Sequence, residues 1–338
     1  MCCLFISSWP NRPRDSPSFR TLSPAAASGN TYIDGHLKHL LLDANPLNVE
    51  QLLDQMNSSA LFYGRRGLFT MALSAMDNTL WDIAGKHAWQ PVYQLPGGQP
   101  KARIAIDRSG GDIPQAQTAG IRNFKLFPRV GPDTPAAAMN RTIDQIMTAR
   151  ETMGPEGNLM TDCVSRTGTV DWAVDFAERV RPANLFFREE LLSPDNVFGY
   201  AELVERIGGG GPGWTKVACG EHEYTEHGFD VLIRVGSSEV LQPDMTWCGG
   251  VTAGRRIARL VEAASLEIIP HRGGSLRGLP IALTSPSRTM PESVPAGSAI
   301  LDAMKPLEEN GDVLAPETPG FGTTLTEALV LDQRLSSA

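Results

Sequence analysis

The fold class is decided by residues 158–190, which read NLMTDCVSRTGTVDWAVDFAERVRPANLFFREE. This stretch opens with a short apolar run (158–161) and closes with a second one (185–187). Between the two runs, apolar side chains recur at helical spacing from Trp172 to Val180. A strand, a helix and a second strand in succession predict a βαβ unit, in which the two strands lie parallel.

The same alternation continues on both sides of this unit. Seven strand candidates are separated by segments of helical period, and they lie at 103–106, 124–127, 158–161, 185–187, 216–219, 240–241 and 266–269. This number fits a closed (β/α) barrel better than an open doubly wound sheet. No GxGxxG opens a helix after a strand, which argues against a dinucleotide-binding fold.

An ionisable residue follows five of the predicted strands. These residues are 27, 32, 23 and 27 positions apart, the length of one βα unit, and are Asp162, Glu189 (or Glu190), Glu221, Asp244 and His271. A single carboxylate after a strand is commonly a helix N-cap, but capping does not explain five at unit spacing. Side chains at the C-terminal ends of barrel strands face the barrel mouth, where barrel enzymes place their active sites. The spacing therefore predicts an active site there.

The residue types at these positions indicate a metal and a base. Asp162, Glu189 and Glu221 offer carboxylate oxygens, which Mg²⁺ prefers as ligands. Zinc is not expected, because the sequence has no HExxH and no Cys–His pair at ligand spacing. A lone histidine after a strand is more often structural. His271 is nevertheless a candidate general base, because Asp244 one unit earlier can orient its imidazole.

The N-terminal part of the chain has a different pattern. Residues 31–100 are predicted to be mostly helical, because apolar residues from Leu73 to Ile83 recur at steps of three and four. A second short helix is predicted at 48–56. Residues 1–30 are rich in Ser, Pro and Arg and have no helical or strand period, so we expect an irregular segment there.

Composition excludes several classes of protein. Of the 338 residues, 41% are apolar and 20% are charged, which argues against a disordered chain. The net charge of −8 argues against binding to nucleic acid, and no apolar stretch approaches the ~18 residues of a membrane span. The five cysteines lack both CxxC spacing and the density of a disulfide framework. We therefore expect a cytoplasmic protein with free thiols.

Several longer phrases carry a family resemblance. They run in one order over residues 31–326 and are GRRGLFTMALSAMDNTLWDIAGK (64–86), PVYQLPGG (91–98), FREELLSPDN (187–196), CGEHEYTEHGF (219–229), LQPDMTWCGGVT (241–252), IIPHRGG (268–274) and PETPGFGTTLT (316–326). Together they resemble the enolase superfamily in its mandelate racemase-like branch, and within it the acid-sugar dehydratases. The combination of GEHEYT, QPDxxWCGG and PGFG is specific to this group, since none of these phrases is a general barrel signature.

The resemblance implies an α/β protein with a (β/α)7β TIM-like barrel and a small, truncated, mostly helical N-terminal capping domain. The implied division is an irregular segment at 1–30, a partial capping domain at 31–100, the barrel at 101–310, and a C-terminal segment at 311–338 that returns to the cap. It also implies Mg²⁺ as the cofactor and a small-molecule sugar acid as the substrate. We expect a homo-oligomer that binds neither nucleic acid nor a membrane.

The resemblance also assigns roles to individual residues. Glu292 in MPESV corresponds by position to a carboxylate that ends the last strand and contacts the substrate or the developing enolate. Spacing alone does not decide whether Glu189 or Glu190 binds the metal, but the family's EE pair favours the first. The implied site comprises Mg²⁺ ligands Asp162, Glu189 and Glu221, with the general base His271 paired to Asp244.

Two further residues are candidates with open alternatives. His222 directly follows Glu221 and is either a substrate contact or auxiliary acid, or a structural histidine. Lys125 lies in FKLFPRV and either approaches the site or packs its stem beside a strand. Relatives that use a lysine base place it two residues later, where Phe127 stands here. The second base that a racemase needs is therefore absent.

The expected reaction is abstraction of the C2 proton of a sugar acid and elimination of its 3-hydroxyl, giving a 2-keto-3-deoxy sugar acid. Residues 1–30 do not resemble the strand meander that closes the site in relatives. The main alternative is therefore a catalytically impaired or dead member of the superfamily, and we expect an open site with solvent-accessible metal carboxylates. A racemase or epimerase is the lesser alternative. The sequence does not decide which sugar acid is used.

Overall fold

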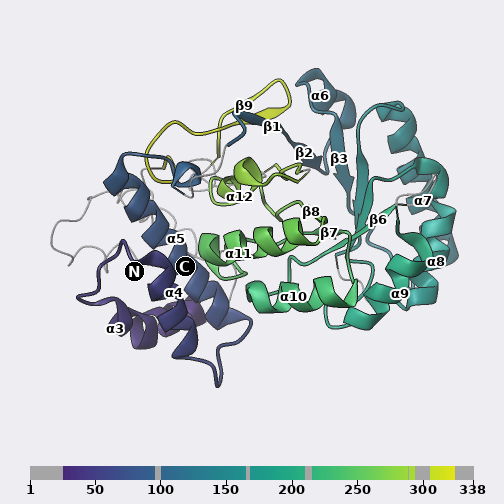
Figure 1. Ribbon diagram of the computed structural model, residues 1–338. Helices are drawn as coiled ribbons and strands as arrows, with labels where there is room; N and C mark the ends of the chain where they lie inside the picture. Colours follow the sequence, from purple (N-terminus) through teal and green to yellow (C-terminus); the bar gives the residue numbers. More distant parts are fainter. Residues whose placement is uncertain are drawn as a thin grey trace.

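The computed structural model describes residues 26–95, 100–164, 168–209, 215–287, 289–293 and 305–323, with side chains from residue 28 onward. Strands and helices alternate around a curled parallel sheet, and a group of N-terminal helices lies at one side of it (Figure 1). This arrangement confirms the predicted fold class. Within these ranges, no helix has both the length and the apolar character needed to cross a membrane.

The barrel sheet contains seven parallel strands in sequence order. They are β2 (Asp107–Ser109), β3 (Asn123–Leu126), β4 (Leu159–Asp162), β5 (Phe187–Glu189), β6 (Lys216–Cys219), β7 (Val240–Leu241) and β8 (Glu267–Ile268). Residues 289–293 return to the first strand, where Glu292 forms a parallel bridge with Asp107. This segment takes the place of the eighth strand of a (β/α)7β barrel.

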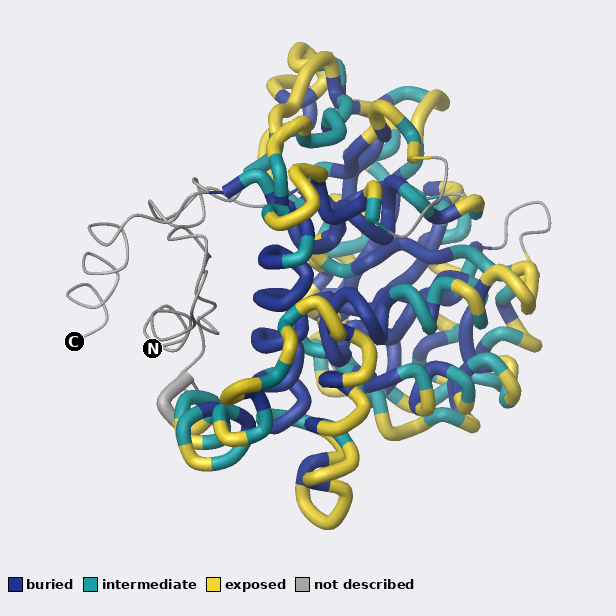
Figure 2. The backbone as a smooth tube through the Cα atoms, turned by 60° about the vertical axis from the view of Figure 1, so that its left-hand side comes forward, coloured by how far each residue is buried: buried dark blue, intermediate teal, exposed yellow. Residues whose placement is uncertain are grey.

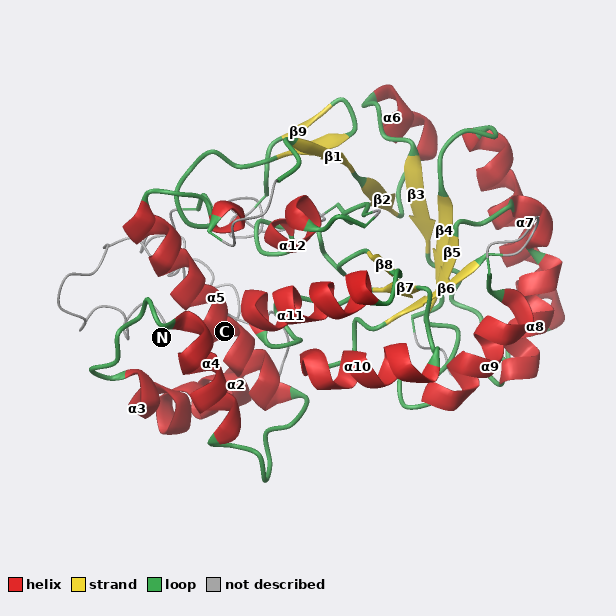
Figure 3. Cartoon of the chain, in the orientation of Figure 1, coloured by secondary structure: helices red, strands yellow, loops and turns green. Residues whose placement is uncertain are grey.

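Helices between the strands cover the outside of the sheet (Figure 3). In the described ranges they are α6 (Ile113–Thr118), α7 (Ala136–Met153), α8 (Val170–Arg179), η3 (Arg181–Ala183), α9 (Val197–Ile207), α10 (Thr225–Val235), α11 (Gly250–Ala263) and α12 (Leu279–Thr284). Helix α8 shows why they form. Thr169 caps its N-terminus by accepting a hydrogen bond from the backbone N–H of Trp172, and Phe176 is buried on its inner face.

Two hydrophobic clusters hold the barrel together. The larger one lies between the sheet and the helices, and the barrel strands are almost entirely buried (Figure 2). The smaller one takes one side chain from each of six successive strand segments, namely Met160, Phe187, Ala218, Val240, Ile269 and Met290. These side chains fill the barrel interior as a packed layer, so the barrel is not a pore.

The N-terminal helices confirm the prediction of a mostly helical region. They are α2 (Ala26–Tyr32), the π-helix η1 (Ile33–Leu37), α3 (Lys38–Leu41), α4 (Val49–Ser58), α5 (Leu68–Ala88) and the 3-10 turn η2 (Val92–Gln94). The expectation of an irregular segment through residue 30 is wrong for residues 26–30, because α2 packs against α5. The rest of that expectation, at 1–25, lies outside the described residues.

The run at 103–106 is not a barrel strand, which corrects the sequence prediction. Strand β1 (Arg103–Ala105) pairs antiparallel with β10 (Asp312–Leu314), which pairs with β9 (Glu308–Glu309). Only the middle residue of β1 is buried, because this small sheet lies at the edge of the molecule. The next segment of the C-terminal chain reaches the cap, where Gly320 forms a bridge with Pro91.

Helix α5 packs against α11 of the barrel through buried polar side chains. Asp77 accepts hydrogen bonds from the backbone N–H and the hydroxyl of Thr252, at 2.9 and 2.6 Å. The same hydroxyl accepts a bond from the indole N–H of Trp81 at 2.8 Å. Asn78 bonds to backbone groups before and within α11. These matched donors and acceptors fix the cap helix on the barrel.

Candidate active site

The register of β4 and β5 directs Asp162 and Glu189 into the barrel. Met160 and Phe187, two residues earlier on the same strands, belong to the interior cluster. Side chains two positions apart on a strand point to the same face, so both carboxylates share that interior face. Arg188 points the other way, and its guanidinium donates to a backbone carbonyl of α8.

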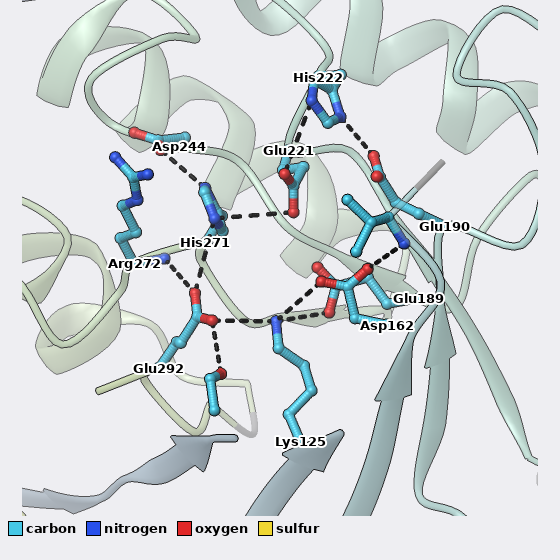
Figure 4. Close-up of polar contacts among 12 residues, drawn as sticks. Lys125, Asp162, Glu189, Glu190, Glu221, His222, Asp244, His271, Arg272 and Glu292 are labelled. Carbon is cyan, nitrogen blue, oxygen red and sulfur yellow. Dashed lines mark hydrogen bonds and ion pairs between the residues drawn. The ribbon is translucent and has the colours of Figure 1, made fainter. Parts of the chain in front are cut away.

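Glu221 completes a group of three carboxylates (Figure 4). It follows β6 after Gly220, whose φ of 122° suits glycine and is strained for other residues. One oxygen from each of Asp162, Glu189 and Glu221 lies within 4.8 Å of the others. The expectation of solvent-accessible metal carboxylates is wrong, because these residues are only 5%, 0% and 8% exposed. The depth of their strand ends in the barrel buries them.

Glu190 belongs to a different part of the site from Glu189. Its φ of 50° is in the left-handed region, and it turns the chain away from the strand direction. The Glu190 carboxylate accepts a hydrogen bond from Nδ1 of His222 at 2.6 Å. The structure therefore brings His222 to the site but leaves Glu189, and not Glu190, beside Asp162 (Figure 4).

Lys125, on β3, points into the same interior. Its ammonium lies 2.8 Å from Glu189, 3.2 Å from Glu292 and 3.9 Å from Asp162. Burial alone would lower the pKa of Lys125, but Glu189 and Glu292 outweigh burial and hold the pKa well above its usual value. Lys125 is therefore a fixed positive charge among the carboxylates. Phe127, two residues on, is 40% exposed.

His271 and Asp244 form the predicted pair. Nδ1 of His271 lies 2.8 Å from Oδ2 of Asp244, and Thr246 donates its backbone N–H and its hydroxyl to Oδ1, both at 2.6 Å. Nε2 of His271 lies 3.8 Å from Glu221. Burial would lower the pKa of His271, but the charge of Glu221 and the bond to Asp244 raise it to about 9.

Glu292 links the last strand segment to the rest of the site. It accepts hydrogen bonds from the hydroxyl of Ser109 at 2.6 Å and from the backbone N–H of Arg272 at 2.9 Å. Burial would raise the pKa of Glu292, but Lys125 and His271 hold it well below its usual range. Glu292 is therefore an ionised acceptor next to the imidazole.

The three converging carboxylates fit a divalent cation. Burial raises the pKa of Asp162 to about 7 and of Glu221 to about 9, and the charge of Glu189 adds to both effects. Oε1 of Glu189 is buried and has no hydrogen-bond partner in the described part of the chain. A bound cation would offset the repulsion and give this oxygen a partner. Three carboxylate ligands with room for water or substrate are typical of Mg²⁺.

Two residues of the site were missed by the sequence predictions. Asp107 is buried at the start of β2, where burial raises its pKa to about 8 against the opposing charge of Lys125. It directly follows the run at 103–106. Because the sequence predicts that run as the barrel strand, it does not predict a strand that begins at Asp107. Trp247 contacts the rings of His222 and His271, and it stands inside the QPDMTWCGG phrase without a spacing rule that marks it.

Comparison with known protein families agrees with this architecture. Residues 18–97 match the mandelate racemase/muconate lactonizing enzyme N-terminal domain, and residues 113–329 match the enolase C-terminal domain-like family. The chain therefore belongs to the mandelate racemase/muconate lactonizing enzyme family of the enolase superfamily.

Individual relatives and solved structures show which members of the family this chain resembles. L-rhamnonate dehydratase of Saccharopolyspora erythraea is 31% identical over 319 residues, covering 92% of this chain and 80% of that protein. Rhamnonate dehydratase of Gibberella zeae, in a crystal structure complexed with Mg, superposes with a TM-score of 0.80 at 28% identity, covering 91% of this chain and 76% of that one. A racemase from Streptomyces coelicolor with bound magnesium has a TM-score of 0.78 at 28% identity, covering 92% and 84%.

Proposed function

We propose that this protein is a Mg²⁺-dependent acid-sugar dehydratase, a carbon–oxygen hydro-lyase. The observation that carries the proposal is the convergence of three carboxylates beside the His271–Asp244 pair at one barrel mouth. Dehydration of a sugar acid needs a base next to a positive charge, because negative charge develops as the C2 proton leaves. The similarity to L-rhamnonate dehydratases supports a substrate of that kind.

Asp162, Glu189 and Glu221 are the proposed metal ligands. Mg²⁺ bound there would supply positive charge that stabilises the charge developing on the substrate carboxylate. The three ligand residues are buried, and their low exposure strengthens electrostatic interactions at this position. Lys125 adds a fixed positive charge 2.8 Å from Glu189.

Nε2 of His271 is the proposed acceptor of the C2 proton. Nδ1 is engaged with Asp244, which selects the tautomer and holds the ring orientation. The raised pKa of His271, about 9, is due largely to Glu221. Positive charge bound by Glu221 would oppose this rise and bring the pKa of His271 closer to neutral pH. A general base works best when its pKa is near the operating pH.

Elimination follows at C3. The C3–O bond breaks with its electron pair on oxygen, and the imidazolium of His271 returns its proton so that water leaves. The resulting enol tautomerises to the 2-keto-3-deoxy acid, gaining a proton at C3 and losing the proton of its C2 hydroxyl. His222, whose Nε2 lies 3.8 Å from Glu221, is a second candidate for the acid or for a substrate contact. Glu292, held ionised, is proposed to accept a hydrogen bond from the substrate.

A racemase or epimerase is the lesser alternative, and it would need a second base on the face of the substrate opposite His271. Lys125 is buried and engaged with three carboxylates, so it is not available to exchange a proton with substrate. Phe127 occupies the position where relatives place a lysine base.

We also propose that residues 31–100 act as a capping domain, 101–310 as the barrel and 311–338 as a segment returning to the cap. The bridge between Gly320 and Pro91 supports the last of these. Assembly as a homo-oligomer and a cytoplasmic location stay predictions.

The test is a screen of sugar acids, L-rhamnonate included, with the purified protein and Mg²⁺, measuring formation of 2-keto-3-deoxy acids. We expect turnover of at least one acid that carries hydroxyls at C2 and C3. His271→Asn should lower kcat at least ~10²-fold while Mg²⁺ binding, measured by calorimetry, is retained. Absence of product with every acid would reject the dehydratase in favour of an impaired enzyme, and exchange of the C2 proton without elimination would favour a racemase.

A further inference from the structure

Two histidine–carboxylate pairs stand on either side of Glu221. Nδ1 of His271 bonds to Asp244 at 2.8 Å, and Nδ1 of His222 bonds to Glu190 at 2.6 Å. In each pair the second ring nitrogen, Nε2, lies 3.8 Å from an oxygen of Glu221. Both imidazoles therefore direct the same nitrogen at one carboxylate (Figure 4).

The ring of Trp247 contacts both imidazole rings. Its ring centroid lies 5.6 Å from that of His222 and 5.4 Å from that of His271, with tilted interplanar angles of 37° and 46°. These distances are within the range of direct aromatic contact. Trp247 is only partly buried, so it stands at the mouth rather than in the packed interior.

Trp247 is itself held from two directions. Its backbone N–H donates to the carbonyl of Asp244 at 2.9 Å, which joins it to the orienting partner of His271. The guanidinium of Arg272 lies 5.6 Å from the centre of its ring, within cation–π range. Arg272 has a φ of 50° and donates its own N–H to Glu292, so its position is set by the turn that follows His271.

We propose that Trp247 is a positioning residue that sets the orientation of both imidazoles, an inference that rests on the dehydratase function proposed above. A single hydrogen bond at Nδ1 leaves each ring able to rock about that bond. Contact with the Trp247 ring restricts this motion and keeps both Nε2 atoms directed at the same space above Glu221. Proton transfer needs such alignment, because small misplacement of a catalytic group can lower the rate by up to ~10²-fold.

The test compares two substitutions at one position. Trp247→Leu removes the aromatic contact and should lower kcat by about 10- to 100-fold with KM changed less than about threefold. Trp247→Phe keeps a ring next to both imidazoles and should retain kcat within about threefold. Trp172→Leu is the matched control, because Trp172 stacks on Phe176 on the outer helix α8 and should leave kcat unchanged.

A second measurement does not depend on activity. The chain has six histidines, so the ring signals of ¹³C-histidine can be resolved and assigned by NMR. Trp247→Leu should shift the ring signals of His222 and His271 together, and those of His36, His39, His87 and His227 should stay in place.

The outcomes separate this inference from the proposed function. If no sugar acid is turned over, the dehydratase proposal fails, while unchanged NMR signals would still overturn the positioning by Trp247. Unchanged signals for both histidines, or a Trp247→Phe variant as impaired as Trp247→Leu, would overturn the inference. A rise in KM with kcat retained would also overturn it, since Trp247 would then act by binding substrate.

Discussion

Two buried polar regions of this protein differ in how their hydrogen bonds are matched. At the contact of α5 with α11, the carboxylate of Asp77 receives two bonds from Thr252, and the Thr252 hydroxyl receives one from Trp81. At the barrel mouth, Oε1 of Glu189 has no hydrogen-bond partner among the described residues, and carboxylates face one another. The contrast shows that this chain matches polar groups where they hold the cap and leaves acceptors in excess where a cation fits.

The same contrast predicts different consequences of mutation in the two regions. Substitutions at the contact of α5 with α11 should lower the free energy of unfolding and leave the activity per folded molecule unchanged. Substitutions at the mouth should abolish activity with little loss of stability, because mutual repulsion already destabilises the acidic group there.

The largest expected effect is that of Glu221→Gln. Loss of this proposed metal ligand should lower kcat/KM at least ~10³-fold, because a bound metal contributes several kcal/mol to transition-state stabilisation. Burial raises the pKa of Glu221 from 4.5 to about 9. Between these values the unfolded chain is ionised and the folded chain holds the proton, so this group makes stability fall as pH rises from about 4.5 to 9. The metal-free variant should therefore melt no lower than the wild type at pH 8, by calorimetry.

Glu178→Gln is the matched control for this substitution. Glu178 is half-exposed on α8 and pairs only with Arg181 in the described ranges, so activity and Mg²⁺ affinity should stay at the wild-type level. A melting temperature of Glu221→Gln well below that of the wild type would contradict the picture of a repulsive mouth.

The second prediction concerns the pH dependence of stability. Burial raises the pKa of Asp77 from 3.8 to about 7, although hydrogen bonds from Thr252 oppose the rise. Between these values the unfolded chain is ionised and the folded chain binds the proton, so this group makes stability fall as pH rises from about 4 to 7. The fall is at most about 4 kcal/mol, at 1.36 kcal/mol per pKa unit.

Asp77→Asn isolates this contribution. We expect urea unfolding at several pH values to show that the wild type loses free energy of unfolding from about pH 4 to 7 relative to the variant. The difference between the two proteins should therefore shift in favour of the variant up to about pH 7. A difference that does not vary with pH would show that Asp77 is ionised in the folded protein throughout this range.

Thr252→Val should cost about 2 kcal/mol of stability. The change keeps the shape of the side chain but removes the donor to Asp77 and the acceptor for Trp81, leaving both groups buried without that partner. Urea unfolding measures the loss, and kcat measured below the transition should match the wild type. Thr152→Val is the control, because its hydroxyl is exposed on α7 and donates to the carbonyl of Thr148 in its own helix. A fall in kcat with Thr252→Val would show that the contact of α5 with α11 also controls the mouth.

The smallest effect is expected for Arg256→Ala. Arg256, on α11, forms two bonds to Asp54 of α4, at 2.7 and 3.1 Å, and one to Glu226 of α10 at 2.9 Å. Because these pairs lie near the surface, the loss should be about 1 kcal/mol and should shrink in 1 M salt. Arg234→Ala, which removes a single exposed pair with Asp230, should be neutral in the same unfolding assay. Equal effects of the two variants would show that the contact of Arg256 with Asp54 adds nothing to the free energy of unfolding.

Local pattern was sufficient for most of the fold. The strands at 216–219 and 240–241 and the helix around Leu73 to Ile83 lie where apolar spacing predicted them. The run at 103–106 was misassigned, because an antiparallel edge strand and a barrel strand have the same local pattern. Its partner lies more than 200 residues away at β10, and no local rule reveals such pairing.

For the site, sequence spacing predicted which residues would meet but not how they would pair. The unit spacing of Asp162, Glu189 and Glu221 identified the strand ends, because each βα unit returns the chain to the same edge of the barrel. Which of Glu189 and Glu190 lies beside Asp162 depends on the direction of the side chains along β5. Phe187 faces the barrel interior, so Glu189 does too, and only the folded sheet defines that face. The contact of Lys125 with three carboxylates likewise depends on which way β3 faces.

The sequence by itself determined the alternation of strands and helices and the residue types at the barrel mouth, since both follow from periodicity along the chain. Only the tertiary structure decided that the mouth carboxylates are buried, that Glu190 bonds to His222, and that Trp247 contacts two imidazoles. These contacts join residues that follow different strands of the sheet. Their distances depend on the curvature and register of the curled sheet, which no single segment encodes.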